Sequence, residues 1–273
     1  MAMVINTNVS SINATRQLDV SSREQAVSME RLTSGLRINS AADDAAGLAV
    51  ANKMTSQIMG TDQAVRNAND GISMAQTIDG AAEEMGDMMQ RQRELAVQSL
   101  NGTYSAANRA SMDAEFNALS AELTRISSTT KFNGVSVLDT AVSTNLQVGW
   151  EDGANDSINI TTIGGTAIAT AVTALGVDTS ANAAAAITGL DGQISALSTA
   201  RSGVGAVQNR LEHTVANLQN VSENISAARS GIQDADFALE SANLARTQVL
   251  QQAGMSMLSQ ANSNSQNVLA LLR

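Results

Sequence analysis

Proline and cysteine are absent from this sequence of 273 residues, and aromatic residues make up only 2% of it. Because an interior proline costs a helix about 3 kcal/mol, a chain without proline suits long, uninterrupted helices. Without cysteine the chain has no disulfide framework and no thiolate chemistry. The shortage of aromatic rings leaves the core to aliphatic side chains. These absences favour a helical protein whose chemistry does not depend on thiols.

Positive charge is also scarce, with 16 lysine and arginine residues against 26 acidic residues and a formal net charge of −10. Nucleic acid phosphates need a basic surface, so this balance argues against a nucleic-acid partner. No apolar run approaches the roughly 20 residues that span a bilayer, and we expect no membrane insertion. Residues 1–4 lead directly into Asn6 and Thr7, so we also expect no cleaved secretion signal.

The strongest periodic pattern runs from Ile187 to Ile232, where seam positions recur at alternating steps of three and four residues. A period of 3.5 indicates a helix packed lengthwise on a neighbour in a left-handed supercoil. Such a helix is roughly 69 Å long, so its partners must be rods too. The predicted apolar rod seam comprises Ile194, Leu197, Val204, Leu211, Val215, Leu218 and Ile225. Polar residues that interrupt the seam, and are expected to set its register and partner, are Arg201, Gln208, Ser222 and Arg229.

Two further helices are predicted before this rod. Asp43 and Asp44 are residue types expected at a helix start, as cap and dipole partners. The same spacing then continues over residues 47–99, with small residues in its middle that allow close helix contact. After a break at 101–103, a shorter helical pattern covers residues 106–126.

Between residues 130 and 186 the pattern changes to alternation. The Asn133-Gly134 pair before alternating valines predicts a tight turn. Apolar residues alternate on both sides of the polar loop 151–157, which predicts a hairpin. These alternating residues are Leu146, Val148, Trp150, Ile158 and Ile160. Residues 161–186 are rich in Ala, Thr, Gly and Ser, and we expect the variable or exposed part of the chain there.

Both ends of the chain carry thin apolar stripes among many polar residues. A helix of this kind is marginal alone, because its stability has to come from packing. Antiparallel packing of the rods brings residues 1–38 beside 235–273 and leaves an apolar edge for other copies of the protein. An ordinary N-terminal bundle helix is the alternative. The residues assigned to polymerisation and to the coiled coil of the two ends are Ile5, Val9, Ile12, Leu32, Leu36, Leu250, Met257, Val268, Leu271 and Leu272.

The predicted fold is therefore mainly α, with long antiparallel coiled-coil rods and a small β-hairpin region at one end, the tip far from the chain termini. The expected domains are the two halves of an inner coiled coil, the two parts of the rod and a short variable hairpin or loop region. Their ranges in chain order are 1–42, 43–139, 140–186, 187–233 and 234–273.

The sequence offers few residues suited to catalysis, so no catalytic residue, metal site or cofactor is predicted. The single histidine, His213, lies off the apolar pattern of its helix, where a solvated side chain is the simplest reading. Glu83 and Glu84 are adjacent and point in different directions on a helix. The acidic loop 151–156 lacks the spacing and terminal Glu of a calcium loop. Methionines such as Met85 fall at seam spacing, where packing is their usual role.

Longer motifs occur in order along the chain. The first part reads Ile-Asn-Thr-Asn at 5–8, Glu-Arg-Leu-Thr-Ser-Gly-Leu-Arg-Ile-Asn-Ser at 30–40 and Ala-Ala-Asp-Asp-Ala-Ala-Gly-Leu at 41–48. The middle has Gln-Arg-Gln-Arg-Glu-Leu-Ala-Val-Gln at 90–98 and Phe-Asn-Gly-Val at 132–135. The tail has Ile-Gln-Asp-Ala-Asp-Phe at 232–237, Gln-Gln-Ala-Gly at 251–254 and Asn-Val-Leu-Ala-Leu-Leu-Arg at 267–273. With these motifs the sequence resembles bacterial flagellin over roughly four-fifths of its length. It resembles a minimal type, because residues 140–186 are too short for large outer domains.

The resemblance implies a non-enzymatic subunit that polymerises into the flagellar filament for motility. It further implies an extracellular protein, exported unfolded by the flagellar type III apparatus, whose terminal helices are disordered in the monomer and fold on assembly. The implied partners are other copies of the chain, an export chaperone at the C-terminal segment, and the filament cap and hook-junction proteins. The many Ser and Thr residues of 140–186 could accept glycans, although such compositions are commonly unmodified.

A host receptor site is also implied by the resemblance. Many flagellins are bound by an innate-immune Toll-like receptor through an Arg, a Leu and a Glu on the rods. Here Arg91, Leu95 and Glu115 match these types, and Arg91 and Leu95 lie four residues apart on one helix face. Contacts between subunits are the alternative, and primary, role for these three residues.

Three other functions compete with the filament subunit. The hook–filament junction protein shares terminal helices and export route with flagellin, but the matches at 90–98 and 267–273 favour flagellin. An intracellular coiled-coil adaptor would be detected only in the cytosol. An enzyme would show turnover that depends on His213.

Overall fold

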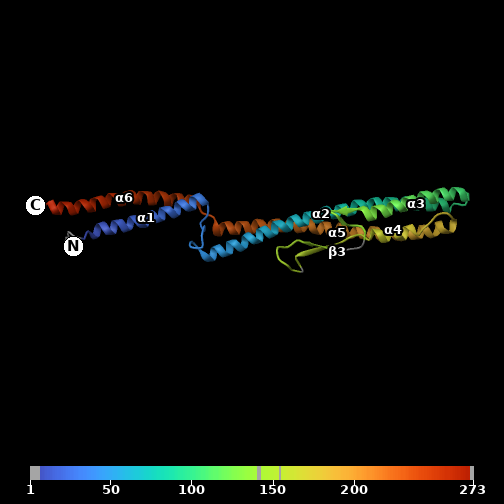
Figure 1. The fold of residues 1–273 in the computed structure, drawn as a ribbon, viewed down its shortest axis with the longest axis horizontal. Helices are drawn as coiled ribbons and strands as arrows, with labels where there is room; N and C mark the ends of the chain where they lie inside the picture. Colours follow the sequence, from blue (N-terminus) through green and yellow to red (C-terminus); the bar gives the residue numbers. More distant parts are fainter. Residues whose placement is uncertain (1–6, 140–142, 154, 271–273) are drawn as a thin grey trace. The chain divides into compact units, whose positions relative to one another are not determined.

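The computed structural model describes residues 7–139, 143–153 and 155–270, with side chains in the last helix described as far as Ser263. The described chain contains six helices and two pairs of short strands (Figure 1). The helices are α1 (Val9–Ser34), α2 (Ala45–Leu100), α3 (Ala106–Thr129), α4 (Gly165–Thr173), α5 (Ser180–Gln233) and α6 (Phe237–Ala270). The strands are β1 (Lys131–Phe132), β2 (Val135–Ser136), β3 (Ser143–Gln147) and β4 (Ser157–Thr161).

Contacts divide the chain into two compact units. The first contains residues 1–56 and 224–273, and the second contains residues 57–223. The mainly α fold predicted from the sequence is confirmed. The expected domain boundaries at 42/43 and 233/234 differ from the division by contacts, because the long helices α2 and α5 each contribute residues to both units.

The second unit has an aliphatic core in which α2 presents one continuous buried face. Every seam position that the sequence pattern marks between Thr61 and Ser99 is buried. On α5 all but one of the buried positions, Ala186, recur every seven residues, the spacing of one coiled-coil heptad. They are Ala183, Leu190, Leu197, Val204, Leu211 and Leu218. Ile194 and Val215 of the predicted seam lie half-buried beside them, and Ile225 is half-buried in the first unit.

Polar residues on the seam of α5 make specific contacts to α2. The guanidinium of Arg201 donates to Asp79 at 2.8 Å and lies 3.8 Å from Glu83. The hydroxyl of Ser222 donates to Asp62 at 3.2 Å. Because each contact joins one position of α5 to one position of α2, shifting either helix by a turn would break it. These residues therefore hold the register of the two helices.

Helix α3 returns along α2 and is joined to it by a buried polar contact. The side-chain amide of Gln92 donates to the carbonyl of Phe116 at 3.1 Å and to the hydroxyl of Ser120 at 2.8 Å. Ser105 caps the start of α3 by accepting from the N–H of Asn108 at 3.3 Å. Phe116 is fully buried, so the single ring on this helix fills the core between polar contacts.

Two antiparallel strand pairs follow α3, as the alternating residues predict. Strand β1 pairs with β2 around Asn133 and Gly134, both in the left-handed conformation that this turn needs. Strand β3 pairs with β4 from Ser143 opposite Thr161 to Gln147 opposite Ser157.

The position of the β3–β4 hairpin differs from the prediction. The sequence pattern places the hairpin region at the far tip of the rods, where α2 turns into α3. Instead, the hairpin lies against α2 near residues 60–67, far from the turn into α3. There Asn67 donates to the carbonyl of Gln147 at 3.0 Å, and Gly60 packs on Trp150. Helix α3 has 24 residues and is about 36 Å long, so it ends partway along the longer helix α2. The chain then continues along α2 into the strands.

Residues 161–186 also differ from the expected exposed region. They contain helix α4, whose residues Ile168, Ala169 and Val172 are buried, and α5 begins at Ser180 rather than at Ile187. Alanines at 183 and 186 continue the buried face of α5 toward its N-terminus. Composition suggested an exposed region, but α4 packs against α3 and buries one of its faces there.

Candidate assembly surface on the terminal helices

Helices α1 and α6 are bounded by local capping contacts. The side chain of Asn8 accepts from the N–H of Ser11 at 3.2 Å at the start of α1. Gly35 ends α1 at φ 71°, a conformation that glycine adopts without steric cost, and its N–H donates to the carbonyl of Arg31. At the start of α6, the carboxylate of Asp236 accepts from the N–H groups of Ala238 and Leu239 at 2.9 and 3.1 Å.

The two helices pack side by side and antiparallel (Figure 1). Asn8 donates to the carbonyl of Ala261 at 2.9 Å, and the hydroxyl of Ser21 donates to the carbonyl of Thr247 at 3.2 Å. Arg31 forms an ion pair of 2.9 Å with Glu240. As residue numbers rise along α1 they fall along α6, which defines the antiparallel direction.

The fully buried part of the seam between α1 and α6 is made of small and polar side chains. Ser21, Ser28 and Thr247 are buried in it, and Gly254 lies so close to Leu18 that a Cβ at position 254 would be 2.7 Å from Cδ2 of Leu18. Burying a large aliphatic side chain stabilises a fold by about 1.5–3 kcal/mol, whereas these side chains bury little apolar area. The seam therefore allows close approach but contributes little hydrophobic stabilisation.

Many large apolar side chains of both helices are instead exposed, whereas Leu18, Leu32, Leu244 and Leu258 are half-buried. Val9, Val20 and Val27 are separated by 11 and 7 residues, close to three and two helical turns, so they lie along one side of α1. Leu239, Leu250 and Met257 repeat the same spacing on α6. We call the exposed apolar residues of the two helices the assembly surface: Val9, Ile12, Val20, Val27, Met29, Phe237, Leu239, Val249, Leu250, Met255 and Met257.

Several residues predicted for the contact between subunits belong to this surface. Val9, Ile12, Leu250 and Met257 are exposed, with exposed fractions of 57, 59, 48 and 67%. Leu32 and Leu36 are half-buried within the first unit. The predicted residues outside the described part of the chain are Ile5, Leu271 and Leu272, together with the side chain of Val268.

The other members of the assembly surface were missed by the sequence analysis, which followed a stripe with steps of three and four. A spacing of 11 and 7 residues, shared by the valines of α1 and by the Leu and Met residues of α6, would have found three of them: Val20, Val27 and Leu239. A second missed residue is Glu240, which is 5% exposed although it carries a carboxylate.

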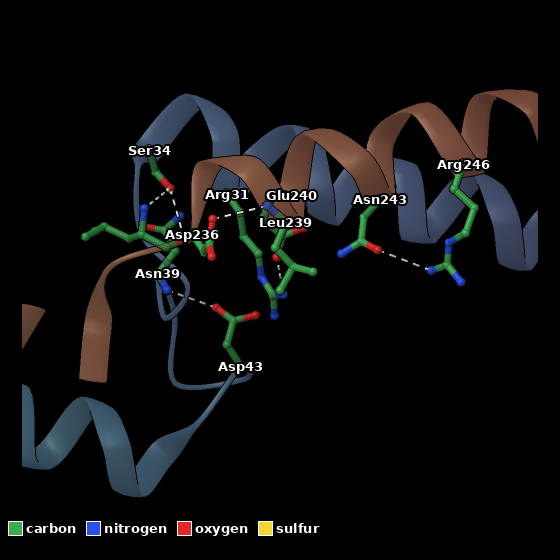
Figure 2. A network of polar contacts seen from close by, with 10 residues as sticks. Arg31, Ser34, Asn39, Asp43, Asp236, Leu239, Glu240, Asn243 and Arg246 are labelled. Carbon is green, nitrogen blue, oxygen red and sulfur yellow. Dashed lines mark hydrogen bonds and ion pairs between the residues drawn. The ribbon is translucent and has the colours of Figure 1, made fainter. Parts of the chain in front are cut away.

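Polar contacts close the junction where α1 ends and α6 begins (Figure 2). The N–H of Arg37 donates to the carbonyl of Gln233 at 2.7 Å, and the N–H of Ala235 donates to the carbonyl of Gly35 at 2.9 Å. Asp43 accepts from the N–H groups of Asn39 and Ser40 at 3.1 and 2.8 Å. These bonds tie both chain segments together within the first unit.

Two carboxylates of this junction have shifted pKa values. The hydrogen bond from Arg31 lowers the pKa of Glu240 below its ordinary value of 4.5, with smaller contributions from Ser28 and Asn243, while burial acts in the opposite direction. For Asp43, the backbone N–H groups of Ser40 and Asn39 lower the pKa, because both donate to its charged form. Both groups are therefore held as carboxylates.

The residues expected at a receptor site are only partly brought together on the surface. Arg91 forms ion pairs with Glu115 at 2.9 Å and with Glu94 at 3.0 Å, and all three side chains are exposed. Leu95 is 2% exposed and belongs to the core of the second unit. Arg91 and Glu115 are available for an external contact in this conformation, and Leu95 supports the helix beneath them.

Among the described residues, the features of a metal site and of a membrane-spanning helix are not found. Within them, no group of three or more His, Cys, Asp or Glu side chains could hold a metal ion. His213 lies exposed on α5. In the described part of the chain, no helix combines the length and apolar character that a membrane crossing needs.

Family comparisons match both parts of the chain. A model of the bacterial flagellin N-terminal helical region matches residues 5–143, and a model of the bacterial flagellin C-terminal helical region matches residues 187–272. A flagellin of Halalkalibacterium halodurans is 47% identical over 99% of this chain and all of the relative. The flagellar filament 31.3 kDa core protein of Treponema maltophilum is 42% identical, and a Bacillus subtilis flagellin is 40% identical, at the same coverage.

Solved structures are similar as well. The crystal structure of Bacillus cereus flagellin is 30% identical and superimposes with a TM-score of 0.51, over 60% of this chain and 94% of that one. A putative flagellar hook-associated protein from Vibrio parahaemolyticus has a TM-score of 0.55 over 70% of this chain and all of its own, but only 11% identity, and so shows a shared fold alone.

Fold and surface thus define a mainly α-helical protein of antiparallel helix pairs, with apolar side chains exposed on the terminal pair. The family models and the relatives identify the class further. The chain belongs to the bacterial flagellin family.

Proposed function

We propose that this chain is the structural subunit of a bacterial flagellar filament and that the assembly surface is where subunits meet. The observation that carries the proposal is the exposure of eleven large apolar side chains on the α1–α6 pair. The fully buried positions between the two helices hold small and polar residues instead. Relatives that align along their full length are named flagellins and flagellar filament core proteins.

The energetics favour contact with identical chains. Full burial of each large aliphatic side chain contributes about 1.5–3 kcal/mol, so covering the assembly surface outweighs what the α1–α6 seam contributes within one chain. Association costs translational and rotational freedom, and this cost requires a large interface. A helical array of copies supplies such an interface because every subunit presents the same two terminal helices to its neighbours.

The same imbalance supports coupled folding and assembly. Ordering a residue costs about 1–2 kcal/mol of backbone entropy, and the polar seam has little apolar burial to offset it. We infer that α1 and α6 are disordered in the free subunit and become helical when neighbours cover the assembly surface. The second unit, with its aliphatic core, stays folded in both states.

The location and the remaining partners follow from this function. We propose that the chain is exported and works outside the cell, in the filament. An export chaperone would cover the apolar side chains of residues 234–273 before export, and cap and hook-junction proteins would contact the filament ends. A Toll-like receptor of a host is a further proposed partner, with Arg91 and Glu115 as the accessible contacts.

The hook–filament junction protein is the competing function within the same fold. The similarity to the hook-associated protein of Vibrio parahaemolyticus concerns fold alone, at 11% identity. The relatives at 40–47% identity are flagellins and a filament core protein, and they align along their full length. The identities favour the filament subunit.

Seeded elongation tests the proposal. Purified subunits mixed with short filament fragments should elongate them into long filaments under negative-stain microscopy. The double variant Leu250→Asp with Met257→Asp should fail to elongate seeds, because burying two unpaired carboxylates is costly. Its thermal unfolding should match that of the unaltered chain, since both side chains are exposed.

A matched control separates the effect of the substituted position from the effect of the added charge. Val135→Asp places the same carboxylate on an exposed residue of β2, outside the terminal helices, and should still elongate seeds. Normal elongation by the double variant would refute the assembly surface. Unaltered subunits that never elongate any seed would point to a junction role instead.

A further inference from the structure

Sulfur in this chain occurs only in methionine, with 12 methionines and no cysteine. Among the described methionines, Met85 and Met89 are fully buried, and Met74 and Met112 are nearly so. Four are largely exposed: Met29, Met59, Met255 and Met257. Three of these four lie on the assembly surface, and the fourth lies on α2 in the second unit.

The methionines of α6 flank its seam with α1. Residues 255 and 257 are two positions apart, so their side chains leave the helix about 200° apart, on either side of the face that carries Gly254 and Thr247. Their exposed fractions are 55 and 67%. Both edges of the α6 contact therefore carry a thioether that water and small solutes reach.

We propose that Met29, Met255 and Met257 are three modification sites at which hydrogen peroxide forms methionine sulfoxide, and that this modification blocks assembly. In the reaction the thioether sulfur attacks one peroxide oxygen and the O–O bond breaks. An S–O bond forms, the sulfur is oxidised by two electrons, and the peroxide is reduced to water. The inference rests on the proposed function, because it assigns the effect to the assembly surface.

The effect on assembly follows from polarity. Sulfoxide formation converts a flexible apolar side chain into a polar one and disrupts methionine-rich interfaces. An added oxygen on a side chain that neighbours must bury has to be desolvated without a prepared partner. The buried methionines of the second unit are shielded from the same reagent, so this unit keeps its fold while the terminal pair loses its affinity for neighbours.

Assembly should in turn protect these sites. Once neighbouring subunits cover α1 and α6, the three thioethers are no longer accessible to the peroxide. A finished filament is therefore resistant to peroxide at these sites, and the free subunit is the sensitive form.

The test compares free subunits before and after hydrogen peroxide treatment. Peptide mass spectrometry should find oxygen added at positions 29, 255 and 257 and none at positions 85 and 89. The concentration needed for seeded elongation should rise at least about tenfold, which corresponds to about 1.4 kcal/mol. Treatment with the two methionine sulfoxide reductases, which act on the two epimers, should restore elongation.

Two variants make the assignment specific, each compared with its own untreated sample. The variant with Met29→Leu, Met255→Leu and Met257→Leu should lose peroxide sensitivity, while Met59→Leu should retain it. Sensitivity that persists in the triple variant overturns the proposal, and so does equal oxidation of these methionines in subunits and finished filaments. Untreated subunits that do not elongate seeds would refute the proposed function, whereas elongation unaffected by oxidation would refute this inference alone.

Discussion

At the scale of single residues, the α1–α6 pair depends more on polar contacts than on apolar ones. The Arg31–Glu240 ion pair joins the end of α1 to the start of α6, with the carboxylate almost completely buried and the guanidinium about one-third exposed. Hydrogen bonds that involve a charged group are stronger than neutral ones, and removing one partner leaves the other uncompensated. This pair is therefore one of the side-chain contacts that fix how the two helices align.

Replacing Glu240 by Gln should weaken filaments and flatten their response to acid. The folded pKa of Glu240 lies below 4.5, so its stabilising contribution is complete above that value and is lost as the pH falls through the lowered folded pKa. Unaltered filaments should release subunits progressively over this range. Glu240→Gln should cost about 1 kcal/mol per subunit at neutral pH and remove part of the acid dependence.

Sedimentation of filaments as a function of pH measures this effect. Glu24→Gln is the matched control, because it removes the same charge from an exposed position of α1. An acid profile for Glu240→Gln that coincides with that of the unaltered filament would show that the ion pair contributes nothing.

At the scale of elements, the close approach of the hairpin to α2 depends on glycine. A Cβ at Gly60 would lie 2.8 Å from Cβ and 3.5 Å from Cα of Trp150, so the chain carrying Trp150 would have to shift. Gly80 lies on the same helix with nothing within 4 Å of an added Cβ. The two glycines therefore separate the effect of packing from that of helix propensity.

Gly80→Ala should stabilise the second unit by up to about 1 kcal/mol, since alanine is the better helix former. Gly60→Ala gains the same helix propensity, but its added methyl group clashes with Trp150. We therefore expect it to be less stable than Gly80→Ala by about 1–3 kcal/mol. Thermal unfolding measures the difference. The emission of Trp150, the single tryptophan, should shift only in Gly60→Ala. Equal stability of the two variants would show that the hairpin does not rest on Gly60.

At the scale of the whole molecule, the two units differ in what stabilises them. The second has a continuous aliphatic core along α2, α3 and α5, whereas the first has a polar seam and exposes its large side chains. Cooperative stability grows with buried apolar area, and regions with few such contacts open at low free energy. One chain therefore combines a unit built on a large apolar core with a unit that exposes many of its apolar side chains.

Amide exchange should reveal this difference directly. In free subunits, amides of residues 9–34 and 237–263 should exchange much faster than those of residues 61–99. In filaments the terminal helices should become protected, while the core of α2 changes little. Free subunits whose terminal amides exchange as slowly as those of α2 would refute coupled folding and assembly.

Much of the second unit could be predicted from spacing alone. The positions between Thr61 and Ser99 follow one helical period because a single face of α2 is covered along its length. The pattern was less informative before Thr61: Val50 fits the spacing but is exposed, and Ala51 beside it is buried. Helix α4 was not predicted, because its alanines and threonines resemble a loop composition and its burial depends on α3.

The sequence by itself determined that the chain is helical, that its longest helices pack as rods and that it resembles bacterial flagellin, because period and motif are local properties of the chain. Only the tertiary structure decided which face of α1 meets α6. The helical period of the sequence identifies candidate contact faces on α1. The choice between these faces depends on how closely the backbones of α1 and α6 can approach each other. Here Ser21, Thr247 and Gly254 allow the close approach, and eleven large apolar side chains of the two helices stay exposed.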